Sequence, residues 1–377
     1  MTASRRALRL GLPAGTLLIA SALQLGDFRF EHLAWEAGLA LALLAIVLIF
    51  ATVFAVLHHA EAIAHRIGEP YGTLVLTGAV TIIEASVIIS LMLHGENNPT
   101  LARESVFSTI MIVTAGVIGI CMTLGGWRHR HQNLKPEGTR AYLSVLIALA
   151  VLTLVLPDYI LTTTPGTYSS AQLALASLLS LLLYGTFLVL QTGRHRDDFL
   201  DDIPATMGPA RMVPAKRAEA SHPADARLSV SAALLVLGLT GIVLLTEHIA
   251  GAVEDGLVAI QVSRPDALVG VFIATLVLAP EALAAIRAAW RNELQRSLNI
   301  ALGSACATIG LTIPAVGAMS LLTGRSLTLG LEPGDMVLLL LSLVISVVNF
   351  GTGRTNVLTG LVHLVVFVAY ICLVLVP

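Results

Sequence analysis

The chain has 377 residues, of which 56% are hydrophobic and 12% are charged, and its formal net charge at pH 7 is −2. This content is too apolar for a soluble domain of ordinary composition, and so small a net charge gives no indication of a nucleic-acid partner. The three cysteines, Cys121, Cys306 and Cys372, all fall within apolar stretches, so disulfides and a zinc cluster are not expected.

Apolar stretches of the length that a bilayer crossing requires recur along the whole chain. At about 20 apolar residues per crossing, we predict about eleven spans, of which the first and tenth are short or poorly bounded. They cover 10–25, 36–58, 73–93, 105–126, 141–161, 171–191, 228–250, 267–287, 298–321, 334–350 and 357–376. Leu, Ala, Val and Ile supply most of the apolar content, which favours an all-α polytopic membrane protein over a β-barrel. No clear cleavage site follows the N-terminal arginines, so the first span is expected to be retained.

The basic residues predict the orientation of these spans. All but four of the 22 Lys and Arg residues fall on one set of alternate termini and loops, the exceptions being Arg29, Arg103, Arg264 and Arg325. Because basic loops stay on the cytoplasmic side, the N-terminus is predicted to be cytoplasmic and the C-terminus external. The short loops suit a multi-pass protein of a bacterial inner membrane.

One long connection divides the spans into two blocks. Residues 193–227 are rich in Pro, Ala and charge without periodicity, which predicts a flexible cytoplasmic linker. The predicted organisation is a leading transmembrane helix in 1–34, a first five-helix repeat in 35–192, the linker, and a second five-helix repeat in 228–377. An odd number of spans per block makes the second block enter the membrane from the opposite side, as in secondary transporters with a mid-depth site.

The third and eighth predicted spans each carry a glutamate near the middle, Glu84 and Glu281. An ionisable group at this depth is costly unless it faces a partner or a cavity, so it marks a candidate functional site. Two such carboxylates can hold a hard cation such as Ca²⁺, Na⁺ or Mg²⁺, or take up protons in its place, which suffices for antiport. The structural alternative is a pair of protonated glutamates that hydrogen-bond between helices.

Neighbouring residues are candidate supporting ligands. Thr77 and Thr81 lie on roughly the same helical face as Glu84 and add hydroxyl oxygens. Pro280 has no N–H, so the carbonyl of Leu276 loses its helical partner and becomes a plausible cation ligand, unless Pro280 makes only an ordinary kink. Two hydroxyl residues of the following spans are weaker candidates whose alternative role is interhelical packing, Thr114 and Ser304.

A second pair of acids, Glu61 and Glu247, lies towards the ends of the second and seventh spans. The predicted topology places Glu61 near the cytoplasmic mouth and Glu247 near the external mouth. Acids in these positions suit proton and cation access from alternate sides. The alternative is a pair of solvated carboxylates at helix ends.

These residues lie in segments that resemble the cation/proton exchanger family of the calcium/cation antiporter superfamily, above all its bacterial calcium/proton antiporter branch of the ChaA type. The matching segments are 60–84, 101–107, 246–247, 279–282 and 299–304. The resemblance covers essentially the whole chain. It implies an eleven-helix fold of two inverted repeats and calcium export driven by proton entry. It further implies that Glu84 and Glu281 are the carriers, with Glu61 and Glu247 on paired gating helices.

The sequence departs from the general pattern of that family before each central glutamate. The family places Gly-Asn there, whereas this chain has Val80-Thr81 and Val277-Leu278. The loss of two amide oxygens weakens a dedicated calcium cage and puts Na⁺ and K⁺ beside Ca²⁺ as candidate substrates.

The expected partners are therefore inorganic cations, protons and the lipid bilayer. No cofactor or nucleic acid is expected, and a homo-oligomer stays open. A sodium/calcium exchanger and a cation channel are the alternatives. A membrane enzyme is disfavoured because the sequence offers no nucleophile–base pair or cofactor motif.

Overall fold

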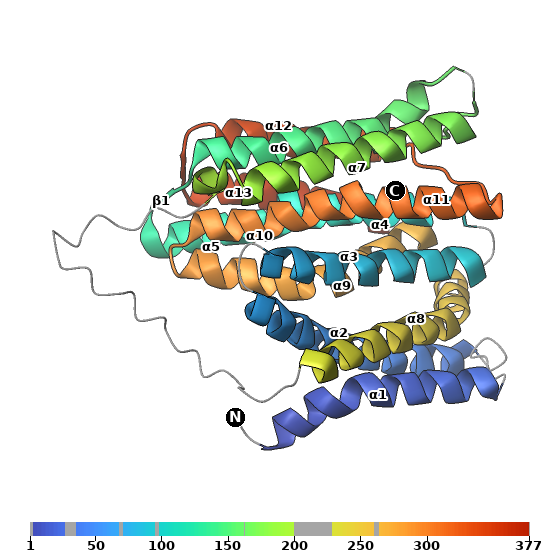
Figure 1. Cartoon of the computed structure of the whole chain (residues 1–377). Coiled ribbons are helices and arrows are strands. Elements are labelled where there is room, and N and C mark those ends of the chain that lie inside the picture. Colours follow the sequence, from blue (N-terminus) through green and yellow to red (C-terminus); the bar gives the residue numbers. More distant parts are fainter. Residues whose placement is uncertain are drawn as a thin grey trace.

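The computed structural model describes residues 3–26, 35–67, 71–94, 98–161, 163–199, 228–259 and 264–376. Helices dominate this part of the chain (Figure 1). The elements up to residue 199 are α1 (Ala3–Leu25), α2 (Trp35–Ile67), α3 (Tyr71–His94), α4 (Leu101–Met111), η2 (Ile112–Val117), α5 (Ile118–His129), β1 (Gln132–Asn133), α6 (Pro136–Ala150), η3 (Val151–Val155), η4 (Leu156–Tyr159), α7 (Ser170–Thr192) and η5 (Arg196–Phe199). The later elements are α8 (Leu228–Ala259), α9 (Pro265–Trp290), α10 (Leu294–Ala307), η6 (Thr308–Thr312), α11 (Ile313–Thr323), α12 (Pro333–Phe350), β2 (Arg354–Thr355) and α13 (Val357–Leu375).

Within the described ranges, eight helices are long and apolar enough to cross a membrane, and a bent pair in α9 makes a ninth. Two shorter apolar helical stretches, Leu10–Leu25 and Gly78–Ser90, coincide with the first and third predicted spans. The predicted class of an all-α polytopic membrane protein is confirmed. The count of eleven spans stays a prediction.

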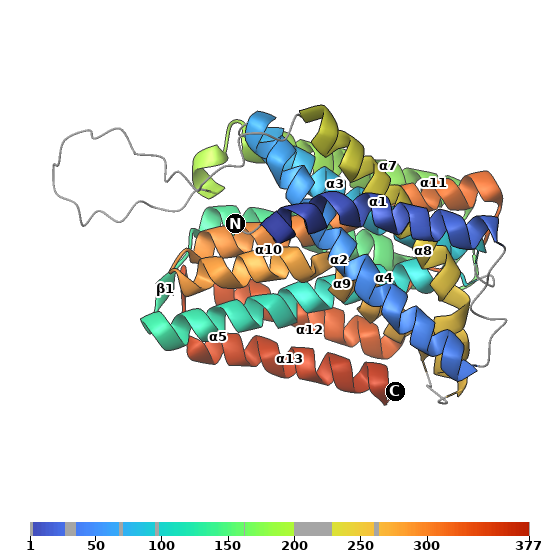
Figure 2. The same cartoon turned by 90° about the horizontal axis from the view of Figure 1, so that it is seen from below.

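The helices form one bundle whose most buried members lie at its centre. Helices α1, α2 and α8 pack together on one side, and α6, α7 and α12 lie on the opposite side (Figure 1). Between them lie α3, α9 and two long interrupted helices, α4–η2–α5 and α10–η6–α11. Helix α13 packs along α5 and beside α12 (Figure 2). The apolar window of Leu101–His129 is 89% buried, against 28% for Val357–Leu375. The first therefore belongs to the core, and the second faces its surroundings.

The two interrupted helices share a local pattern. Each contains a π-helical segment with a Thr-x-Gly sequence, 114–116 in η2 and 308–310 in η6. A Cβ at Gly116 would lie 3.1 Å from Phe367 of α13, and a Cβ at Gly310 would lie 2.6 Å from Tyr184 of α7. Glycine is thus needed in both segments so that an aromatic ring of a peripheral helix can approach the backbone. Helices α7 and α13 also both begin with a capping box.

The loops pair at both ends of the bundle as the predicted topology requires. At one end, the ribbon end, β1 pairs antiparallel with β2. At the other, the distal end, Thr167 forms a bridge with Thr328, and the Thr328 N–H donates to the carbonyl of Pro99. Each pairing joins loops that the sequence assigns to the same side of the membrane.

The first residues of the predicted linker are folded. In η5, Phe199 is buried, and its ring lies 5.3 Å from Tyr142 and 6.0 Å from Phe187. The side chain of Asn299 in α10 donates to the carbonyl of Phe199. Residues 193–199 therefore pack on the ribbon end of the bundle instead of forming part of a flexible connection, and the rest of the linker, 200–227, lies outside the described residues.

Candidate functional site

The side chain of Glu84 lies inside the bundle and is 3% exposed. Two hydroxyl groups donate to its carboxylate: Thr308 Oγ1 lies 2.6 Å from Oε2, and Thr109 Oγ1 lies 3.5 Å from Oε1. Thr109 belongs to α4, in the first predicted repeat, and Thr308 belongs to η6, in the second. The Glu84 carboxylate therefore bridges the two halves of the chain.

This environment makes the charged form of Glu84 costly in free energy. A buried carboxylate is stable only with charge compensation or protonation, and hydroxyl donors supply part of the solvation that it loses. Helix α3 offers it mainly apolar neighbours, among them the buried residues Val80, Ile83, Val87 and Ile88. The two hydroxyl donors alone leave the negative charge of the carboxylate uncompensated, so a proton or a cation would stabilise it.

Glu281 lies directly after a break in α9. The segments Pro265–Ala279 and Glu281–Trp290 are bent by 56° relative to each other, with Pro280 between them. This bend is the effect expected of a proline inside a helix. Helix α9 packs against α3, which carries Glu84, and against both interrupted helices.

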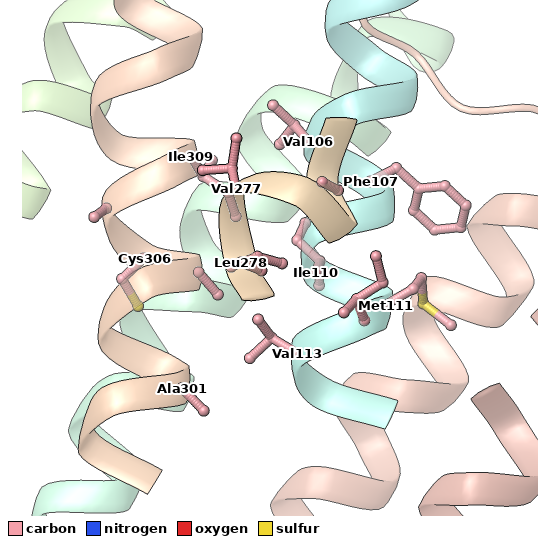
Figure 3. Packing of buried hydrophobic residues seen from close by; sticks show 14 of the residues in the cluster. Val106, Phe107, Ile110, Met111, Val113, Val277, Leu278, Ala301, Cys306 and Ile309 are labelled. Atoms are coloured by element: carbon pink, nitrogen blue, oxygen red, sulfur yellow. The ribbon is translucent and has the colours of Figure 1, made fainter. Parts of the chain in front are cut away.

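The turn before the break is apolar. Val277 and Leu278 are buried and face Val106 and Ile110 of α4 on one side and Ile309 on the other (Figure 3). The two positions at which the family pattern has Gly-Asn are therefore part of the hydrophobic core. They contribute no side-chain oxygen.

The remaining predicted site residues fall into two groups. Several have side chains outside the described residues, although their helices are described: Glu61, Thr77, Glu247, Leu276 and Pro280. Thr81 is buried one turn before Glu84, and Ser304 lies half-buried one turn before Thr308. The hydroxyl of Thr114 donates to the carbonyl of Ile110 at 2.7 Å and lies 2.7 Å from the Ser342 hydroxyl. Thr114 thus contacts α12 and does not bond Glu84.

Comparison with known proteins gives the family of the chain. A family model described as "Sodium/calcium exchanger protein" matches residues 37–193 and 230–376. The chain belongs to the sodium/calcium exchanger family. It is 43% identical to the putative ionic transporter y4hA of Sinorhizobium fredii over 347 residues, which are 92% of this chain and 91% of that protein. It is 37% identical to the sodium-potassium/proton antiporter ChaA of Escherichia coli, covering 88% of both chains.

Solved structures show the same fold. Native YfkE aligns with a TM-score of 0.69 at 18% identity, covering 97% of this chain and 99% of that one. The H⁺/Ca²⁺ exchanger CAX aligns with a TM-score of 0.61 at 14% identity, covering 96% and 89%. The family match and the relative at 37% identity confirm the resemblance to the calcium/cation antiporter superfamily. The chain is a multi-pass membrane protein of a family of secondary cation exchangers. Its bacterial relatives imply an inner-membrane location.

Thr109 and Thr308, the two residues that bond Glu84, were not predicted from the sequence. The Thr-x-Gly pattern at 114–116 and 308–310 was the available signal, and it marks Thr308 as the counterpart of Thr114. The two threonines are used differently, because Thr308 bonds Glu84 whereas Thr114 bonds Ser342.

A network of charges at the distal end, most of them buried, was likewise not predicted from the sequence. Arg264 Nη2 lies 2.6 Å from Asp335 Oδ2, 3.5 Å from Glu332 and 3.8 Å from Glu104. Arg103 donates to Glu104 at 2.6 Å and to the carbonyl of Gly330 at 2.8 Å. The hydrogen bonds with Asp335 raise the pKa of the Arg264 guanidinium, so this cation keeps its charge. The network ties α4, the start of α9 and α12 together.

The Asp335→Asn substitution is expected to destabilise the protein. It removes the carboxylate that faces Arg264 in a buried pair, and breaking such a pair costs about 3 kcal/mol. Thermal unfolding of the purified protein in detergent should show the loss. The matched control is Glu332→Gln, because the Glu332 side chain is 55% exposed and an exposed pair contributes below about 1 kcal/mol. Equal stability of the two variants would contradict the assigned role of the network.

Proposed function

We propose that this protein is a cation/proton antiporter that exports cations in exchange for protons, with Glu84 and Glu281 as the shared binding site. The observation that carries this proposal is the buried carboxylate of Glu84, which accepts hydrogen bonds from Thr109 and Thr308 in the two halves of the chain. If the two halves move relative to each other, the hydrogen bonds to the carboxylate between them change as well. Membership of an exchanger family supports the same conclusion.

In the proposed cycle, the site opens to the cytoplasm with both glutamates deprotonated and binds a cation. The two halves then rock about the site, and protons from outside displace the cation. The protonated carrier returns because its buried carboxyl groups are neutral. When no cation is bound, Thr308 donates its hydroxyl hydrogen to the Glu84 carboxylate. The lone pairs of the Thr308 hydroxyl oxygen are then available to a cation that binds between Thr308 and Glu84.

The halves are proposed to be the inverted repeats 35–192 and 228–377, after the leading helix 1–34 and separated by the linker 193–227. The family model matches two separate blocks with nearly these limits, which supports the division. The paired Thr-x-Gly segments and the paired capping boxes support it independently. Glu61 in α2 and Glu247 in α8 are proposed as the access acids of the two halves. The N-terminus is proposed to be cytoplasmic.

The substrates are proposed to be Ca²⁺ together with Na⁺ or K⁺. Two carboxylates favour a divalent ion, but Val277 and Leu278 lie in the core and supply no amide oxygen. The relative at 37% identity is described as a sodium-potassium/proton antiporter, and relatives at 22% and 23% identity are described as Ca²⁺/H⁺ antiporters. A site that lacks the amide oxygens of the family pattern, and that has carboxylate and hydroxyl groups in their place, suits broad selectivity among cations.

The proposal is tested in everted membrane vesicles that are acidified inside and loaded with a pH dye. Ca²⁺, Na⁺, K⁺ and Mg²⁺ are added in turn, and loss of the proton gradient is recorded. Collapse by Ca²⁺ and by a monovalent ion is expected. Exchange of Ca²⁺ for Na⁺ without proton movement would favour a sodium/calcium exchanger. Downhill flux without a fixed exchange ratio would favour a channel.

The Thr308→Val substitution is expected to raise the KM for the transported cation about tenfold, because the Glu84 carboxylate loses its shortest hydrogen bond. Thr308→Ser keeps the hydroxyl and is expected to stay within about threefold of the wild type. Both are measured in the same vesicle assay. An unchanged KM in the valine variant would remove Thr308 from the site.

A further inference from the structure

The hydrogen-bond pattern of the interrupted helix α4–η2–α5 changes at one backbone carbonyl, that of Thr114. In a π-helical segment an N–H bonds the carbonyl five residues back, and here the N–H of Ile118 bonds the carbonyl of Val113. The α-helix resumes at Ile118. In α-helical geometry the next N–H, that of Gly119, pairs with the carbonyl four residues back, that of Ala115. The change from one pattern to the other therefore passes over the carbonyl of Thr114, which lies between Val113 and Ala115.

A histidine of another helix donates to that carbonyl. His363 of α13 is buried, and its Nδ1 lies 2.7 Å from the carbonyl oxygen of Thr114. Because a carbonyl only accepts, Nδ1 carries the hydrogen. The His363 ring stacks on Phe350 of α12 at a centroid distance of 5.9 Å and an interplanar angle of 16°. The imidazole is therefore held in one orientation.

Two neighbours complete this attachment. The Thr114 hydroxyl pairs with Ser342 of α12, so the hydroxyl and the carbonyl of Thr114 are each bound by one of the last two helices. Gly119 allows the close approach of α13, because a Cβ there would lie 3.1 Å from the Cβ of His363 and 2.9 Å from Leu364. A π-helical segment in a membrane helix is thereby fixed from outside.

The position of this segment affects the candidate site. An extra residue per turn rotates the helix on one side of it by about 100° relative to the other side. Thr109, which bonds Glu84, lies just before the segment, and α5, which packs against α9, lies just after it. Return of the segment to a regular α-helix would change the angle between these two faces. One of them would then turn away from its glutamate-bearing helix.

We propose that His363 is a positioning residue for cation exchange, which acts by donating to the Thr114 carbonyl and so holding the π-helical segment between Thr109 and α5. The role rests on the proposed function, since the segment aligns the surroundings of Glu84 and α9. The His363 ring bonds the Thr114 carbonyl and stacks on Phe350, so its proposed action is through the backbone of the interrupted helix.

The test compares two substitutions at residue 363. His363→Leu removes the donor, and His363→Asn keeps a side-chain N–H close to the position of Nδ1. The leucine variant is expected to raise the KM for the transported cation about tenfold, and the asparagine variant is expected to restore it to within about threefold of the wild type. Equal KM values for leucine and wild type, or equal failure of both variants, would overturn the proposal.

Two further variants separate this role from general packing. Tyr370→Phe removes another hydrogen bond from α13 to α4, the 2.8 Å bond to Ser108, and is expected to leave the KM unchanged. Gly119→Ala pushes α13 away without altering His363 and is expected to raise the KM as the leucine variant does, which keeps the test open if that variant does not fold. An equal rise in Tyr370→Phe, or none in Gly119→Ala, would contradict the proposal.

A readout without transport distinguishes failure of this inference from failure of the proposed function. Amide hydrogen exchange of the purified protein is expected to be faster over residues 114–119 in His363→Leu than in His363→Asn. Equal exchange in the two variants would overturn the anchoring role. A wild-type protein that moves no cation, but shows this difference, would overturn only the proposed function.

Discussion

The Glu84→Gln variant should lose cation-driven proton movement, with exchange lowered about a hundredfold or more. Glutamine keeps the shape of the side chain and can still accept from Thr308, but it carries no titratable charge. A cation would then meet one carboxylate fewer, and no proton could be carried at this position. The expected defect is therefore in exchange and not in folding.

The measurement is dissipation of a pH gradient in everted vesicles with matched amounts of each variant. Glu332→Gln is the control, because it removes an acid whose side chain is 55% exposed at the distal end. Glu84→Asp serves as a second control that keeps the charge and shortens the side chain. Wild-type exchange in Glu84→Gln would exclude Glu84 as a carrier.

The Glu281→Gln variant is expected to show an equally large loss. Glu281 lies at the 56° break of α9, a helix that packs against α3, which carries Glu84. In the proposed cycle the two carboxylates serve one site. The effects of substitutions at residues that act as a unit are not additive, so removal of the second carboxylate lowers the exchange rate little further once the first is gone. The double variant Glu84→Gln/Glu281→Gln should therefore be no worse than either single variant.

Initial exchange rates of the single and double variants test this prediction. Pro280→Ala provides a matched variant next to Glu281 that keeps both carboxylates and relaxes the break. It should retain part of the exchange. Substantial exchange in both single glutamine variants would refute the assignment of the site, and additive losses would indicate two separate sites.

Glu84 could be found from the sequence because the free-energy cost of a carboxylate within an apolar span depends on the residues next to it in the chain. A carboxylate in the middle of an apolar span can be recognised without knowing what packs around it. Pro280 likewise predicts a break in the helix that contains it. The alternation of basic and other loops predicts which loops share a side of the membrane, and the loops that pair at the ribbon end and at the distal end agree with this division. These features depend on neighbouring residues or on simple counting.

The hydroxyl partners of Glu84 could not be predicted in the same way. Thr308 is far from Glu84 along the chain, and its contact depends on how the two halves pack. The π-helical segments leave no apolar periodicity of their own, so the outward rotation of Thr114 towards Ser342 could not be foreseen. The charges around Arg264 lie at span ends, where a sequence pattern cannot separate a buried pair from an interfacial one.

The central claim is that a cation and protons compete for the same buried carboxylates. The most direct test adds cation to the purified, detergent-solubilised protein in weakly buffered solution and records released protons. The account predicts proton release from the wild type, in proportion to bound cation, and release that is absent or strongly reduced in Glu84→Gln. Cation binding by the wild type with no proton release across the neutral range of pH would contradict the account.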